Sequence, residues 1–203
     1  MKGILIFLTI FIPFVMNSKN YFKDGMEWRT LVWGTHEPVP TYGMETVTLE
    51  KSADNDMLKM YRYSDNDISD RKFVAFVRTD GDKVFFKVDE SDTSEWYLMY
   101  DFGLKPGEGC YIYSPRVVSE NKSPFVKMYL KCVNVLTDAG GWDIMTLEEY
   151  EDDSCQEIPG HNISVTWIKG LSSTRGVLWN NRFNSDGGSG LLKEVYDLSL
   201  IHI

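Results

Sequence analysis

Residues 72–103 read KFVAFVRTDGDKVFFKVDESDTSEWYLMYDFG, and this stretch decides the fold. Residues 72–79 and 83–88 are both rich in Phe and Val, which suit a pleated, half-buried strand. The turn between them reads Asp-Gly-Asp, and Asp-Gly supplies the positions with φ above zero that a tight hairpin needs. The sequence therefore predicts that these two runs pair as an antiparallel hairpin.

A third apolar run at 95–101 follows a polar break at 89–94, so the hairpin extends into a meander. No segment of the chain sustains a helical period, and short β-type runs alternate with turns. The sequence therefore predicts an all-β domain, an antiparallel meander that closes into a sandwich or barrel with little helix. Further strands are expected at 28–34, 44–50, 57–63, 110–113, 125–136, 163–168, 177–179 and 191–196, while 142–150 fits either a strand or a short helix.

The N-terminal segment 1–18 has the pattern of a secretory signal peptide. Lys2 precedes an apolar run at 4–15, which is shorter than the roughly 20 residues that span a membrane. An uncleaved N-terminal anchor is the alternative. We expect export to the periplasm, the cell surface or the outside, with no stable membrane span after signal cleavage. Residues 19–197 are then one domain, and 198–203, LSLIHI, resemble the translation of a sequencing-adapter read-through.

The formal charge of −9 limits the partners that the domain is expected to bind. Nucleic acids and anionic lipid surfaces attract basic proteins, so neither is expected here. A glycan or an envelope protein remains as the expected partner class.

Three cysteines, Cys110, Cys132 and Cys155, are an odd number for an exported chain. Their spacing fits no metal or redox motif. Separate buried thiols are the first expectation, and one disulfide of undetermined pairing is the alternative.

No motif in the sequence predicts a catalytic site. His36 and His161 lie in separate loops, which gives no zinc-binding spacing. Ser189 almost matches G-x-S-x-G, but the strand–elbow–helix context is missing, so residues 180–190 are expected to be a surface loop. Glu148 and Glu149 beside Trp142 are the best available carboxylate pair, and they are a weak one.

A calcium ion is the only cofactor that the sequence suggests. Asp65, Asp67 and Asp70 lie in an acidic turn with alternating oxygen ligands, as hard cations prefer. The turn does not match the calcium loop of an EF-hand, and a solvated turn is the alternative.

Candidate ligand-binding residues come from the tryptophans and from the glycine-rich segment near the end. Exposed aromatic rings on a β-domain can stack on sugars, although such rings more often fill a core. Asn and Asp oxygens in a loop suit a sugar or a weakly held cation. The candidate residues are Trp142, Trp179, Asn181 and Asp186.

The order of motifs resembles a broad group of uncharacterised exported proteins from Bacteroidales. The resemblance rests on EWRTLVWG, METVTLE, KMYRY, FVAFVRTDGDKVFFK, EWYLMYDFGLKPGE, WIKGLSSTRGVLWNN and GSGLLKEVYD, and it covers nearly all of the chain after the signal peptide. It implies an exported all-β domain, with a sorting module beyond the domain in many members. It implies no catalytic residue.

We therefore expect an exported, non-catalytic β-domain that binds a glycan, a peptide or an envelope partner. The first alternative is a polysaccharide hydrolase that uses paired carboxylates. The second is a structural or adhesive surface module without a discrete pocket.

Overall fold

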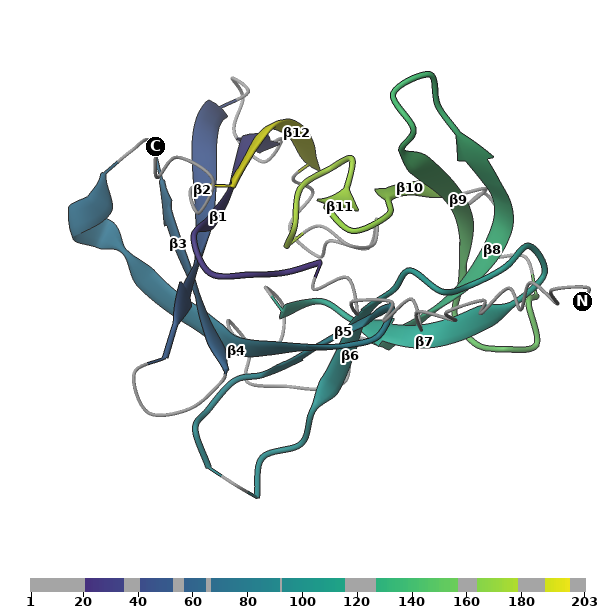
Figure 1. Ribbon diagram of the computed structural model, residues 1–203, viewed down its shortest axis with the longest axis horizontal. Coiled ribbons are helices and arrows are strands. Elements are labelled where there is room, and N and C mark those ends of the chain that lie inside the picture. Colours follow the sequence, from purple (N-terminus) through teal and green to yellow (C-terminus); the bar gives the residue numbers. More distant parts are fainter. Residues whose placement is uncertain are drawn as a thin grey trace, which may run out of the picture.

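The computed structural model describes residues 21–34, 41–52, 57–64, 67–91, 93–115, 127–156, 164–178 and 189–197. Within these ranges the chain forms twelve β-strands and one short 3-10 helix, η1 (Ile68–Asp70). The strands make two antiparallel sheets, both curled, and their concave faces enclose a common core (Figure 1). The predicted all-β, antiparallel architecture is confirmed.

The first sheet has seven strands and contains the predicted meander. Its first six strands pair in the order of the sequence, and the last strand of the chain returns to pair with the first. In spatial order the strands are β12 (Ser189–Asp197), β1 (Met26–Gly34), β2 (Thr41–Lys51), β3 (Leu58–Ser64), β4 (Lys72–Asp80), β5 (Lys83–Lys87) and β6 (Tyr97–Asp101).

The second sheet has five strands, also paired in the order of the sequence. Its strands are β7 (Gly109–Tyr113), β8 (Lys127–Thr137), β9 (Asp143–Tyr150), β10 (Ser164–Ile168) and β11 (Ser172–Ser173). The long β8–β9 hairpin extends away from the rest of the molecule at the upper right of Figure 1. The ambiguous segment 142–150 is thus a strand, whereas the two-residue strand β11 was not predicted.

The hairpin of β4 and β5 forms as the sequence predicts. Its strands are antiparallel, and Asp80 lies opposite Lys83 across the two-residue loop. Within the loop only Gly81 has a positive φ, 58°, so the central pair is Gly81 and Asp82 and the turn resembles type II′. Phe76 therefore lies opposite Lys87, and Arg78 lies opposite Phe85.

The core between the two sheets is rich in aromatic rings. Tyr100 in β6 is fully buried and packs edge-on against Trp167 in β10, with ring centroids 4.9 Å apart. Its hydroxyl donates to the Val177 carbonyl at 2.8 Å and accepts from the Ser173 backbone N–H at 3.2 Å. Burial raises the pKa of Tyr100 above its usual range. These contacts join the two sheets and satisfy the only polar atom of a buried ring.

Two predictions about the end of the chain need correction. Val177 and Leu178 are buried turn residues and not a strand, because they wrap the core beside Tyr100. Ser189 and Gly190, expected in a loop, belong to β12 and lie opposite Trp33 and Val32 of β1. An extended, paired backbone is not the sharp elbow that a nucleophilic serine needs.

The three cysteines are free thiols. Cys132 is buried, and burial is the main reason that the pKa of Cys110 is raised to about 12. Because the thiolate is the reactive form, this shift lowers the reactivity of Cys110 near neutral pH. Among the residues described, no helix has both the length and the apolar character to cross a bilayer.

Candidate functional site

The strongest candidate site is the outer face of β3, β4 and β5, together with the residue just before β6. Strand alternation sends Val77, Val84 and Phe86 into the core, where they are fully buried. The residues between them point away from the core and bring rings and cations together. We call this surface the cation–aromatic face, and its members are Lys59, Tyr61, Arg71, Phe73, Phe76, Arg78, Phe85, Lys87 and Trp96.

Lys87 lies at the centre of the cation–aromatic face and is only 4% exposed. Its Nζ is 5.8 Å from the centroid of Phe76 and 5.4 Å from that of Trp96. The same ammonium donates to the carbonyls of Glu90 and Ser91 at 3.4 and 3.2 Å. A buried charge needs such partners, so Lys87 ties the β5–β6 connection to the sheet beside Trp96.

Arg78 lies beside the same tryptophan and is exposed. Its guanidinium carbon is 4.3 Å from the centroid of Trp96 and 5.5 Å from that of Phe85. Among the described residues, no carboxylate lies within 4 Å of this guanidinium. Because the guanidinium is planar, its stacking on a ring leaves the N–H groups at its edge free for a ligand.

The other end of the face depends on a β-bulge. The β3–β4 register shifts between Met60 and Tyr61, which leaves Val74 as an extra residue in β4. Strict alternation would place Phe73 on the core side, but after the bulge its ring lies 4.9 Å from Phe76. Phe73 remains 40% exposed. The bulge therefore lengthens the row of rings on the outer face.

Arg71 closes this end of the row. It lies over the ring of Tyr61 at 3.8 Å, and Tyr61 contacts Phe73 edge-on at 5.9 Å between centroids. Unlike Arg78, Arg71 is neutralised by a carboxylate, because Nη2 is 2.5 Å from Oε1 of Glu50. The cations of the face are thus not equivalent, and Arg78 is the exposed one without an acidic partner among the described residues.

An acidic cleft of about 440 Å³ lies beyond the turn of the β4–β5 hairpin. Asp101 accepts from the Gly103 backbone N–H at 3.0 Å, and Asp82 accepts from the Tyr21 hydroxyl at 2.6 Å. Glu108, at the edge of the same cleft, accepts from a backbone N–H at 2.9 Å. These carboxylates hold turns and the N-terminal segment in place.

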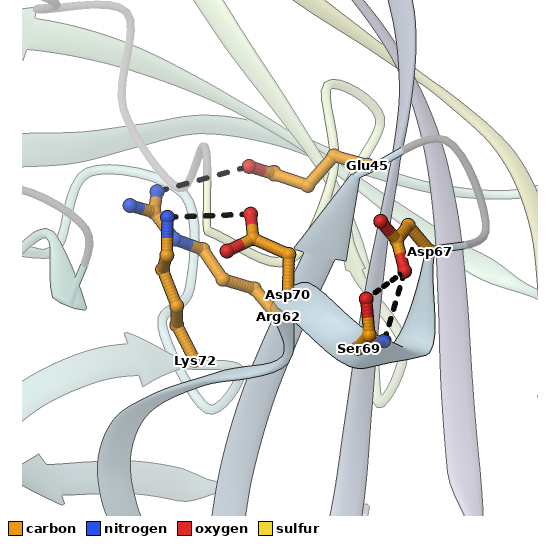
Figure 2. Close-up of polar contacts among 6 residues, drawn as sticks. All are labelled: Glu45, Arg62, Asp67, Ser69, Asp70 and Lys72. Atoms are coloured by element: carbon orange, nitrogen blue, oxygen red, sulfur yellow. Dashed lines mark hydrogen bonds and ion pairs between the residues drawn. The ribbon is translucent and has the colours of Figure 1, made fainter.

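A smaller cleft of about 220 Å³ lies near η1, where the calcium site was predicted (Figure 2). Asp70 pairs with Lys72 at 3.3 Å, and Glu45 lies 3.9 Å from Arg62. Asp67 instead accepts from the backbone N–H of Ser69 at 2.9 Å and from its hydroxyl. The Ser69 hydroxyl is the main cause that lowers the pKa of Asp67.

The two described members of the predicted calcium site point in different directions. Figure 2 shows the carboxylate of Asp67 turned toward Ser69 and that of Asp70 turned toward Lys72. Asp65, the third member, lies outside the described residues. Within the described ranges, no three His, Cys, Asp or Glu side chains gather as a metal site would require.

Trp142 lies in the turn of the β8–β9 hairpin and is 47% exposed. Asp138 fixes this turn by accepting from the backbone N–H groups of Trp142 and Gly140 at 2.9 and 2.8 Å. Glu148 and Glu149 are consecutive in β9 and therefore lie on opposite faces of the sheet. They cannot act together on one glycosidic bond.

The remaining predicted binding residues, Trp179, Asn181 and Asp186, lie outside the described residues, as do His36 and His161. No family model, curated protein or solved structure matches this chain.

The cation–aromatic face was not predicted from the sequence, although part of its signal was present. The hairpin turn fixes the register, and the register places Phe76 beside Lys87 and Arg78 beside Phe85 on the outer face. Nothing in the sequence indicates that Trp96 and Phe73 belong to this face. Trp96 lies in the β5–β6 connection, and the position of Phe73 depends on the bulge.

Proposed function

We propose that this protein is an exported, non-catalytic binding domain that holds a glycan on its cation–aromatic face. The observation that carries the proposal is Trp96, a ring on the outer sheet surface whose centroid lies 4.3 Å from the Arg78 guanidinium and 5.4 Å from the Lys87 ammonium. A ring held in this way loses little conformational freedom when a ligand stacks on it. The export part of the proposal rests on the pattern of residues 1–18.

A glycan suits this surface because it offers both apolar and polar contacts over an extended length. One side of a sugar ring carries C–H groups that pack on an aromatic face, and its hydroxyls meet hydrogen-bond donors at the rim. The aromatic rings, which differ in exposure, are those of Phe73, Phe85 and Trp96. The hydrogen-bond donors are those of Arg78 and Lys59. The rings of the cation–aromatic face come from three neighbouring strands and the β5–β6 connection, which gives room for more than one sugar unit.

The hydrolase alternative keeps one specific observation in its favour, the acidic cleft beside the same hairpin. Its carboxylates already hold backbone groups, as Asp101 holds Gly103. A hydrolase would release new reducing ends from a polysaccharide that the domain binds, whereas a binding domain would retain the polymer unchanged.

Two tryptophans, the partly buried Trp96 and the exposed Trp142, allow a matched test of the site. The full chain, secreted from an expression host, is run by affinity electrophoresis through gels that contain individual soluble polysaccharides. We expect at least one polymer to retard the wild-type protein. Trp96→Ala should lower that affinity about tenfold or more, since a buried aromatic anchor contributes about 2 kcal/mol or more.

Trp142→Ala is the control, because this ring is exposed but lies in a different hairpin. It should leave the retardation unchanged. If Trp142→Ala removes the binding and Trp96→Ala does not, the site is at the β8–β9 turn. If no polymer retards the wild-type protein, the proposed function is wrong.

A further inference from the structure

The surroundings of Arg78 indicate which chemical group the ligand presents to it. We infer that the glycan bears isolated carboxylate groups, such as one acidic sugar in an otherwise neutral chain, and that Arg78 binds this carboxylate. The inference rests on the proposed function. It adds a charge requirement that the rings alone do not impose.

The geometry of Arg78 fits a carboxylate better than a hydroxyl. The guanidinium is exposed, stacked against Trp96 at 4.3 Å, and without an ion pair among the described residues. A stacked guanidinium is already oriented, so less freedom is lost when its two parallel N–H groups meet two carboxylate oxygens. A sugar ring on Trp96 or Phe85 would place its own carboxylate within reach of this edge.

Lys59 gives the face a second cation of the same kind. Its Nζ lies 5.7 Å from the centroid of Phe76, and it has no carboxylate partner among the described residues. By contrast, Arg71 is paired with Glu50, and Lys87 is enclosed by backbone carbonyls. The face therefore presents two available cations, each beside a ring.

The surroundings of the face argue against a densely charged ligand. Asp89, Glu90 and Glu95 are exposed on the β5–β6 connection, next to Trp96. The whole chain has a formal charge of −9. Both features repel a polyanion at long range, while a single carboxylate can still gain the short-range contact with Arg78. The expected ligand is thus acidic but sparsely charged.

The test compares glycans that differ only in one acidic group. The probes are 3′-sialyllactose with lactose, and a xylohexaose that carries one glucuronic acid with unbranched xylohexaose. Heparin and a single-stranded oligothymidylate serve as dense polyanions. Affinities of the full secreted chain are measured by isothermal titration calorimetry at low and physiological salt.

We expect the acidic member of at least one pair to bind about tenfold more tightly than its neutral twin, as charge-assisted hydrogen bonds allow. Arg78→Gln should remove this preference, so that the acidic glycan binds no more tightly than its neutral twin. Lys105→Gln, an equal change of charge at an exposed turn outside the face, should retain the preference. Heparin and the oligothymidylate should bind more weakly than the acidic glycan.

The outcomes separate the inference from the function on which it rests. If acidic and neutral twins bind equally, and Trp96→Ala still abolishes the binding, the glycan site stands and the carboxylate inference is wrong. If heparin or the oligothymidylate binds most tightly, the face recognises polyanions and the inference is also wrong. If none of the probes binds, the carboxylate inference is wrong, and the face does not bind glycans of the kinds tested.

Discussion

The two faces of the β4–β5 hairpin share one backbone, but their side chains are buried by different kinds of neighbours. On the inner face, Val77, Val84 and Phe86 are fully buried among apolar side chains of both sheets. On the outer face, Phe76 is almost as well buried, at 5% exposed, yet it lies outside the main core cluster. The difference shows that burial alone does not define the core.

The covering of Phe76 explains this difference. Lys59 and Lys87 lie over its ring, so the apolar stems of cations take the place that a second sheet takes inside. Such a cover contributes less stability than close-packed hydrocarbon, because charges must keep water or hydrogen-bond partners. It also leaves donors at the surface. The inner face therefore stabilises the fold, and the outer face is available for recognition.

The largest expected effect tests the inner face. Phe86→Ala removes a fully buried ring that packs on Tyr97 and should lower the free energy of unfolding by about 3–5 kcal/mol. Phe85→Ala, the adjacent ring on the outer face, should cost only about 1 kcal/mol, because that ring is half-buried. Urea denaturation followed by tryptophan fluorescence measures both changes. Equal losses would mean that the two faces do not differ as described.

An intermediate effect is expected at Lys87, where the outer face is most buried. Lys87→Ala removes two hydrogen bonds to backbone carbonyls and the stem over Phe76, so it should cost about 1–2 kcal/mol. Amide hydrogen exchange should also become faster in the connection near Ser91. If Lys87→Ala leaves both the stability and the exchange unchanged, Lys87 does not position Trp96.

Much of the fold could be predicted because it depends on local patterns. The hairpin register follows from the two-residue turn at Gly81, and the short strands follow from their β-branched and aromatic residues. The pairing of β12 with β1 and the division into two sheets could not be predicted. They join segments far apart in the sequence, and no local pattern specifies which segments meet.

The candidate site was harder to predict than the fold, for two physical reasons. A bulge reverses the side of the sheet on which Phe73 lies, and no residue type in the sequence predicts this bulge. Lysine is usually exposed, so nothing in the sequence indicates that Lys87 is buried beside Trp96. Sequence reasoning instead favoured Trp142, an exposed ring in the turn of the β8–β9 hairpin.

The smallest expected effect concerns Arg78, and it is the most informative about function. Cation–π contacts at exposed sites contribute about 0.5–1 kcal/mol, so Arg78→Gln should lower the free energy of unfolding by less than about 1 kcal/mol. Arg71→Gln is the matched control, because that guanidinium also lies on a ring but is held by Glu50. Its loss should cost at least as much, since a salt bridge is removed as well.

The same urea denaturation experiment compares the two arginine variants. A cost above about 2 kcal/mol for Arg78→Gln would mean that the guanidinium is part of the structural framework, since one exposed cation–π contact is too weak to account for it. Its N–H groups would then not be free for a ligand. A small cost, together with a lost preference for acidic glycans, would separate recognition at Arg78 from the stability that the inner face provides.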